Sequence, residues 1–197
     1  MSSKLGRKTY QHSVDGKQIV VFDDVLSAAD QVTLHESAAT SQYYRQGATE
    51  RAETVVRYWV SPLTPTYGRK TFYHHVALAH IRTCVPRITP RLHQVYINSH
   101  GSGEMVYPHV DSVTPEMVTV LLYANREWDT RWGGETVFYN DQSDAVACVT
   151  PRPGRMVLMN GSLMHRATPP LRGCSEDRLV LVFKYLYPEG SRPLIDG

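Results

Sequence analysis

Two histidines and one aspartate in the second half of the chain have the residue types and order of a metal site. His109 and Asp111 are separated by one residue, and His165 follows 54 positions after Asp111. Two imidazoles and one carboxylate on a rigid scaffold form the ligand set that leaves Fe(II) open positions for a cosubstrate and for O2. The leading interpretation is therefore a redox enzyme with His109, Asp111 and His165 as metal ligands and catalytic residues.

The spacing of the first two ligands indicates how they could share one metal. Residues two apart on a β-strand point to the same face, so we expect His109 and Asp111 to lie on a strand and to hold the metal together. His165 can reach the same point only in a closed sheet or a sandwich. A His-x-Asp tripeptide taken alone is a weak signal, because a lone histidine is more often a surface or core residue than a ligand.

A second signal comes from Arg178, thirteen residues after His165 at the head of an apolar strand. Alternation places Arg178 on one face with Val180 and Val182, and a guanidinium inside a barrel requires an anionic partner. Guanidinium groups bind carboxylates in bidentate fashion. The hydroxyls of Thr119 and Tyr123 share a face of their own strand and could add donors to a carboxylate pocket. The alternative is that Arg178 is a strand-edge arginine within the polar run 172–178.

The elements that must position these residues suggest an α+β, mainly β protein. S-x-x-D at Ser27 predicts the start of a helix that runs to about Thr40, and a second helix is expected from about Thr66 to Val85, ended by Pro86. Short β-rich runs follow Pro90, which favours a sandwich or barrel. These runs are Leu92–Ile97, Met117–Tyr123, Glu135–Tyr139, Ala145–Val149, Arg155–Met159 and Leu179–Leu186.

Length and composition are those of one soluble globular domain. The chain has 197 residues and a formal net charge of +2, which is too weakly basic to imply nucleic acid. No run of about 18 apolar residues could span a bilayer, and the N-terminus has no apolar signal region, so we expect a cytoplasmic protein. Three separated cysteines argue against a disulfide framework and are interpreted as reduced thiols. The oligomeric state stays open.

Motifs in the second half resemble those of Fe(II)/2-oxoglutarate dioxygenases of the prolyl-4-hydroxylase-like type. The resemblance covers roughly Leu92 to Tyr187, and its motifs occur in the family's order. They are Gly101 to Gly103, His109 to Ser112, Leu122 to Asn125, Trp128 with Asp129, Gly133 to Phe138, Pro151 to Gly154, His165, Pro169 with Pro170, and Arg178.

The resemblance implies a double-stranded β-helix, or jelly roll, buttressed by N-terminal helices. It implies one domain over 1–197, with helical support and a substrate lid in 1–90 and the catalytic core in 91–188. His109, Asp111 and His165 would be the iron ligands. Arg178 and Tyr123 would bind the distal carboxylate of 2-oxoglutarate, and Tyr96 falls near a family tyrosine that lines this pocket. The gap between His165 and Arg178 is longer than usual, which leaves Arg172 as an alternative.

The reaction implied is hydroxylation of an unactivated C–H bond, with 2-oxoglutarate and O2 as cosubstrates and ascorbate as a candidate reductant. An aspartate at Asp111 favours hydroxylation over halogenation, which requires a small residue there in related halogenases. The expected substrate is a small molecule such as an amino acid or natural-product intermediate. The alternatives are a prolyl or other protein side chain, and a non-catalytic cupin-like metal-binding module.

The segment Tyr43 to Tyr73 is rich in tyrosine and arginine and is either bare surface or a lid that recognises an anionic or aromatic substrate. Single-stranded nucleic acid is the least favoured partner. The remaining histidines considered have no pairing pattern for a second metal and are expected to be structural. They are His74, His75, His80, His93 and His100.

Overall fold

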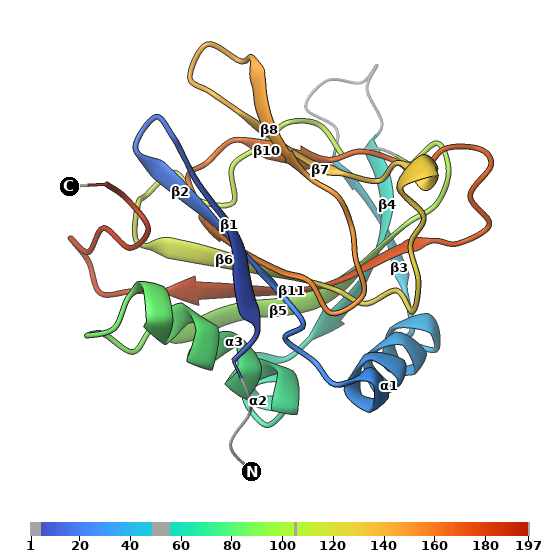
Figure 1. The fold of residues 1–197 in the computed structure, drawn as a ribbon, viewed down its shortest axis with the longest axis horizontal. Coiled ribbons are helices and arrows are strands. Elements are labelled where there is room, and N and C mark those ends of the chain that lie inside the picture. The colour runs from blue at the N-terminus through green and yellow to red at the C-terminus, as the bar shows by residue number, and fades with distance from the viewer. Residues whose placement is uncertain (1–4, 49–55, 105, 197) are drawn as a thin grey trace.

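Two antiparallel sheets form the body of the molecule. A computed structural model describes residues 5–48, 56–104 and 106–196. The larger sheet has the order β1-β2-β9-β6-β11-β5-β4-β3 and the smaller one β10-β7-β8. The strands are β1 (Arg7–Val14), β2 (Lys17–Asp23), β3 (Tyr44–Ala48), β4 (Val56–Leu63), β5 (Arg91–His100), β6 (Met117–Tyr123), β7 (Thr136–Tyr139), β8 (Ala145–Val149), β9 (Met156–Asn160), β10 (His165–Ala167) and β11 (Arg178–Leu186). Figure 1 shows the smaller sheet facing the larger one, which agrees with the predicted jelly roll.

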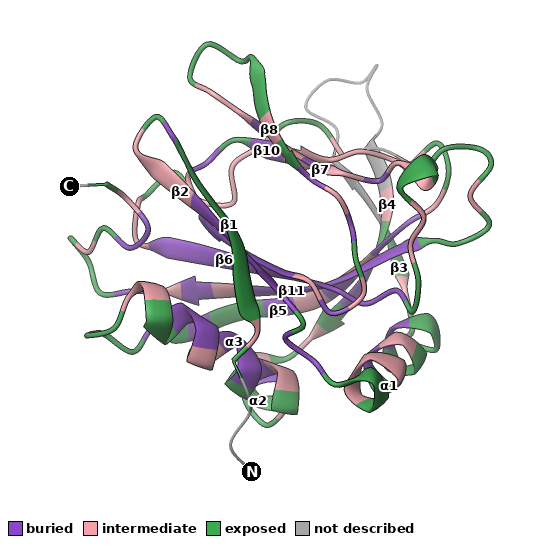
Figure 2. Cartoon of the chain, viewed as in Figure 1, coloured by how far each residue is buried: buried purple, intermediate pink, exposed green. Residues whose placement is uncertain are grey.

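The helices cover the outer face of the larger sheet (Figure 1). They are α1 (Ala28–Ala39), α2 (Pro65–Gly68) and α3 (Phe72–Cys84), with a short 3-10 turn, η1 (Thr130–Trp132), in the connection before β7. Leu34 and Ala38 of α1 and Ile81 of α3 are buried in the core beneath the sheet, and Figure 2 shows the buried part of α3 in purple. None of the helices in the described ranges is long and apolar enough to cross a membrane.

Strict alternation along β11 divides the core into two apolar clusters. Leu181 and Phe183 pack with the helices on the outer side of the sheet. Val180 and Val182 pack with Phe138 between the two sheets. Because successive side chains of a strand point to opposite faces, the inner residues of β11 form the floor of the space between the sheets.

The helix predicted from Ser27 to Thr40 is confirmed as α1, with the Ser27 side chain accepting a hydrogen bond from the Asp30 amide. The helix predicted from about Thr66 to Val85 is wrong in its continuity, because the structure divides it into α2 and α3. Thr71 begins α3 by accepting a hydrogen bond from the His74 amide, an N-cap contact that requires non-helical backbone.

The six predicted strands of the second half are present, and five further strands are not among the sequence predictions. Four of them, β1 to β4, lie in the first 63 residues and belong to the larger sheet. The N-terminal part therefore holds sheet strands as well as the expected helices. The fifth, β10, carries His165 and pairs with β7.

Candidate metal centre

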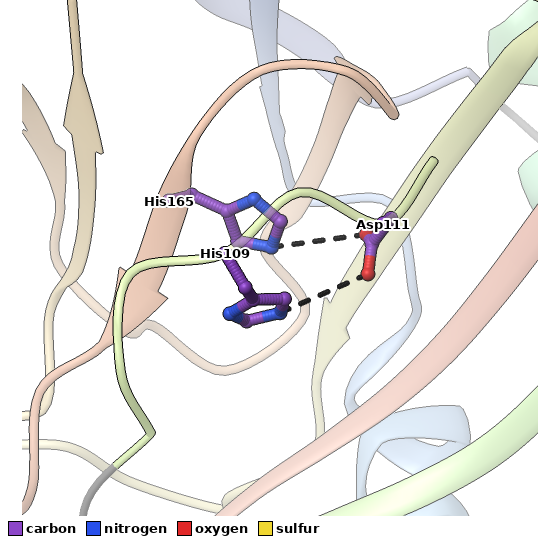
Figure 3. Close-up of side chains that lie close together, drawn as sticks. All are labelled: His109, Asp111 and His165. Atoms are coloured by element: carbon purple, nitrogen blue, oxygen red, sulfur yellow. Dashed lines mark ion pairs between the residues drawn. The ribbon is translucent and has the colours of Figure 1, made fainter. Parts of the chain in front are cut away.

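The side chains of His109, Asp111 and His165 converge on one point. One ligand atom from each lies within 4.8 Å of the others. His109 Nε2 lies 3.8 Å from Asp111 Oδ1, and His165 Nε2 lies 3.7 Å from Asp111 Oδ2. Figure 3 shows both imidazole rings turned toward the carboxylate. The structure thus brings together the three residues that the sequence analysis selected.

The two imidazoles are oriented by hydrogen bonds on their far sides. His109 Nδ1 lies 2.9 Å from the Tyr107 carbonyl oxygen, and His165 Nδ1 lies 2.9 Å from that of Leu163. A carbonyl can only accept, so each Nδ1 carries the proton and each Nε2 presents its lone pair to the shared point. Two imidazole nitrogens and one carboxylate oxygen, already aimed inward, fit the ligand set of a non-haem Fe(II) site.

The prediction that His109 and Asp111 lie together on a β-strand is wrong. His109 forms only an isolated bridge, through reciprocal backbone hydrogen bonds of 3.0 and 2.9 Å with His165. Pro108 has no N–H to contribute to a longer ladder. Asp111 lies in a bend, where its amide donates to the Gly161 carbonyl at 2.9 Å. A Cβ on Gly161 would lie 2.8 Å from that of Met117, so this close approach requires glycine.

The Asp111 carboxylate is held at both oxygens. Thr119 donates to Oδ2 at 2.6 Å, and the Lys184 ammonium lies 2.7 Å from Oδ1. Burial opposes ionisation of this carboxyl, but His165, Lys184 and Thr119 together hold the pKa of Asp111 below its usual value. The pKa of His165 is lowered by burial, with Asp111 acting in the opposite direction. Thr119 therefore supports Asp111, and its predicted role in a keto-acid pocket stays a prediction.

Arg178 is buried at the other end of the same floor. It is 2% exposed, and its Nε donates to the Gly134 carbonyl at 2.6 Å and its Nη2 to Thr136 Oγ1 at 2.9 Å. Within the described ranges, no acidic side chain lies within 4.0 Å of the guanidinium. A buried cation without a counter-charge is unfavourable, so this position favours an anionic ligand. Arg172 is exposed in the preceding turn, which favours Arg178 over Arg172 for this role.

Tyr123 lies beside Arg178, as the sequence analysis expected. The guanidinium carbon lies 5.2 Å from the centre of the Tyr123 ring, and the phenol oxygen is 2.8 Å from Thr136 Oγ1. Gly134 lies under this end of the site with φ of +78°, and a Cβ there would be 2.8 Å from Trp128. The Gly133–Gly134 pair therefore permits the backbone turn that offers its carbonyl to Arg178.

A cavity of about 190 Å³ connects the triad with Arg178. His100 and Asn98 line it, opposite Arg178 and Val180 in the register of β5 and β11. Neither ring nitrogen of His100 nor Asn98 Oδ1 has a hydrogen-bond partner among the described residues. Burial, and then the charge of Arg178, lowers the pKa of His100 to about 3. His100, which the sequence analysis expected to be structural, is thus a buried, neutral imidazole that lines the cavity.

Tyr96 lines the cavity but lies away from Arg178. It pairs with Val182, and its ring centre lies 5.7 Å from the Lys184 ammonium. Burial, followed by the charge of Asp111, raises the pKa of Tyr96, so its phenol remains protonated. Tyr96 thus faces the Asp111 end of the cavity.

The sequence analysis missed several residues of this site. Lys184 could have been found by extending the alternation of Arg178, Val180 and Val182 by one more step. Thr136 and His100 could not have been found, because their roles depend on which strands become neighbours.

Within the Tyr43 to Tyr73 segment, Tyr58 lines the cavity. Arg51 lies outside the described residues. The described part of this segment includes β3 and β4, which pair in the larger sheet, as well as α2 and the start of α3.

The two-sheet fold, the inward-facing triad and the buried arginine define the class of non-haem iron oxygenases that use a keto acid. Residues 93–186 match the family model described as the 2OG-Fe(II) oxygenase superfamily. This match and the His–Asp–His site support an oxidoreductase with Fe(II) as cofactor and with 2-oxoglutarate and O2 as cosubstrates. No curated protein sequence matches the chain.

Solved structures with the same fold are named for, or contain, ligands of different kinds. A prolyl-4-hydroxylase from Pseudomonas putida is 18% identical, with a TM-score of 0.61 over 86% of this chain and 92% of that one. HygX from Streptomyces hygroscopicus, bound to nickel, 2-oxoglutarate and hygromycin B, is 15% identical, with a TM-score of 0.65 over 90% and 86%. A Trichoplax adhaerens prolyl hydroxylase, in complex with a hypoxia-inducible-factor peptide, is 16% identical, with a TM-score of 0.59 over 87% and 84%. This similarity shows the fold and leaves the substrate open.

Proposed function

We propose that this protein hydroxylates an unactivated C–H bond of a small molecule, with His109, Asp111 and His165 holding Fe(II). The observation that carries the proposal is the convergence of two Nε2 lone pairs and one carboxylate in a cavity whose other end holds a buried arginine without an acidic partner among the described residues. Iron bound there supplies the redox chemistry that couples oxidative decarboxylation of 2-oxoglutarate to substrate oxidation. Retention of Asp111 as a ligand favours hydroxylation.

The protein's own residues bind and orient the keto acid. Arg178 is fixed by Gly134 and Thr136, so its remaining N–H groups can pair with the distal carboxylate without further ordering. Tyr123 and His100 flank it, and His100 can donate one N–H because a neutral imidazole carries one proton. Val180, Val182 and Leu121 form an apolar floor between the two polar ends and keep water from the reacting centre.

A small substrate is favoured by the limited size of the cavity over the triad and by the tyrosines that line it, Tyr58 and Tyr96. A peptide substrate is the alternative, supported by the fold shared with prolyl hydroxylases. We also propose that the Tyr43 to Tyr73 segment, which contains β3 and β4, forms the wall that faces the substrate, and that Tyr58 is its contact residue.

The test is formation of succinate from 2-oxoglutarate by the Fe(II)-loaded protein, compared between two arginine variants. Arg178→Met should lower 2-oxoglutarate affinity by about a hundredfold, since a hydrogen-bonded charge pair is worth about 3 kcal/mol. Arg172→Met is the matched control and should behave as the parent. If Arg178→Met kept the parent's affinity for 2-oxoglutarate, or if Arg172→Met lost that affinity, Arg178 would not be the residue that binds the carboxylate. Absence of succinate in the parent would contradict the proposed activity.

A further inference from the structure

Lys184 is a largely buried cation whose charge partner in the described structure is a proposed metal ligand. Its Nζ lies 2.7 Å from Asp111 Oδ1, and its side chain is 13% exposed. The Lys184 ammonium also lies 5.7 Å from the centre of the Tyr96 ring. Lysine is rarely buried without a partner, so the arrangement depends on the charge of Asp111.

Asp111 cannot neutralise both Lys184 and a divalent metal. Fe(II), Arg178 and Lys184 together bring four positive charges to the site. The Asp111 carboxylate and a 2-oxoglutarate dianion bring three negative charges, and no other acidic residue lines the cavity among the described residues. One positive charge is left unmatched in a largely buried site, which is energetically unfavourable.

A groove begins where the ammonium lies. Its volume is about 360 Å³, and it shares Tyr58, Tyr96 and Lys184 with the cavity over the triad. Among its described lining residues there is no aspartate or glutamate. Part of its lining is apolar and comes largely from β4 and the residues after it: Val60, Pro62, Leu63, Pro65 and Val95. The groove thus offers one cation at its inner end and an apolar wall beyond it.

We propose that the substrate of this site carries a carboxylate, which pairs with Lys184, and an apolar body, which lies in the groove along β4. A monoanionic group supplies the one negative charge that the loaded site lacks. The apolar wall contributes affinity in proportion to the apolar area it buries. This inference rests on the proposed function, because it assigns the substrate class of that same site.

The test uses matched pairs of simple probes on an inert form of the protein. Phenylacetate and 4-methylpentanoate are compared with their primary amides by ligand-observed NMR, using protein loaded with Zn(II) and saturated with 2-oxoglutarate. Each acid should bind the parent about tenfold more tightly than its amide, since a partly buried ion pair is worth about 1.4 kcal/mol. Lys184→Met should abolish this preference and Lys184→Arg should retain it. Lys17→Met, which removes a lysine paired with Asp141 at the surface, is the control.

Three results would overturn the inference. Acids and amides could bind the parent alike, or Lys184→Met could keep the preference for acids. Lys184→Met could also lose Zn(II) while its melting temperature stays unchanged, which would make Lys184 a positioning residue for Asp111. Failure of the proposed function is recognised separately, because the zinc-loaded parent would then not bind 2-oxoglutarate at all.

Discussion

At the scale of single residues, the end of the cavity near Arg178 contains buried polar atoms that have no hydrogen-bond partner among the described residues. His100 is 1% exposed, and its ring stacks on Tyr58 with 5.5 Å between centroids. An unsatisfied buried donor costs about 1–3 kcal/mol, so a bound ligand that accepts from His100 recovers that free energy. We interpret His100 as a donor to the keto acid beside Arg178.

Replacing His100 should therefore weaken keto-acid binding without removing the metal. His100→Leu is expected to lower 2-oxoglutarate affinity about tenfold in Zn(II)-loaded protein, measured by calorimetry, while Zn(II) affinity is unchanged. His100→Gln restores a donor and should recover part of the loss. His12→Leu, on the exposed face of β1, is the control. Unchanged affinity in His100→Leu would show that the imidazole does not contact the ligand.

The triad residues could be predicted from sequence because ligand type and motif order are properties of the chain itself. The position of Lys184 on the same face could also have been predicted, since it follows Arg178 at an even spacing along an alternating strand. His100 was not, because its role arises only when β5 lies beside β11 and places it opposite Arg178. Thr119 was placed on the correct face of its strand, but its hydrogen bond to Asp111 was not predicted.

At the scale of elements, β11 sets the distance between the two polar ends of the site. Arg178 and Lys184 are six residues apart on one face, so their Cα atoms are separated by about 20 Å at 3.3 Å per residue. The strand pairs with β5 and β6 on its two sides, which fixes both residues in a rigid sheet. The floor positions the two cations, while the connection after β5 and the strand β10 bring the three proposed metal ligands over it.

The junction of β2 with β9 depends on a buried ion pair. Arg155 donates from Nε to Asp23 Oδ1 at 2.6 Å and from Nη2 to Oδ2 at 3.0 Å. The hydrogen bonds from Arg155 hold the pKa of Asp23 below its usual value. The unfolded chain therefore takes up this proton at a higher pH than the folded protein does. The stabilisation is fully present above the unfolded pKa and is lost as the pH falls through the folded pKa.

Asp23→Asn should destabilise the protein by about 3 kcal/mol at pH 7, because it leaves Arg155 buried without its counter-charge. The difference from the parent should shrink as the pH is lowered below about 4, measured by urea unfolding of the metal-free protein. Asp24→Asn is the control, since its pair with Arg7 spans 3.9 Å at the exposed surface and should matter little. A difference that stays constant down to pH 3 would contradict this assignment.

Local signals predicted some elements well and missed others for identifiable reasons. The apolar run of β6 was predicted with the observed bounds, because burial on both faces leaves a continuous apolar segment. The β1–β2 hairpin was missed, although Asp15 and Gly16 adopt the positive φ values of a two-residue turn. Its strand β1 is mostly exposed and has no apolar pattern to reveal it. The segment that became β3 and β4 was interpreted as surface or a lid because of its arginines and tyrosines.

At the scale of the whole molecule, the helices and the two sheets have different roles. The helices cover the outer face of the larger sheet and leave its inner face for the site (Figures 1 and 2). Residues distant in sequence meet there because the smaller sheet brings β10, and with it His165, over the floor. The fold class was predictable from the order of elements, whereas the participation of the first four strands in the sheet was not.

The most direct test of the central claim is an anaerobic titration of the protein with Fe(II) and 2-oxoglutarate, followed in the visible spectrum. The parent should develop a weak charge-transfer band that saturates with both components, because the triad leaves open positions for the keto acid. Asp24→Ala, at the surface, should behave in the same way, and Asp111→Ala should give no band. A parent without the band, or an Asp111→Ala variant with the parent's band, would contradict the account.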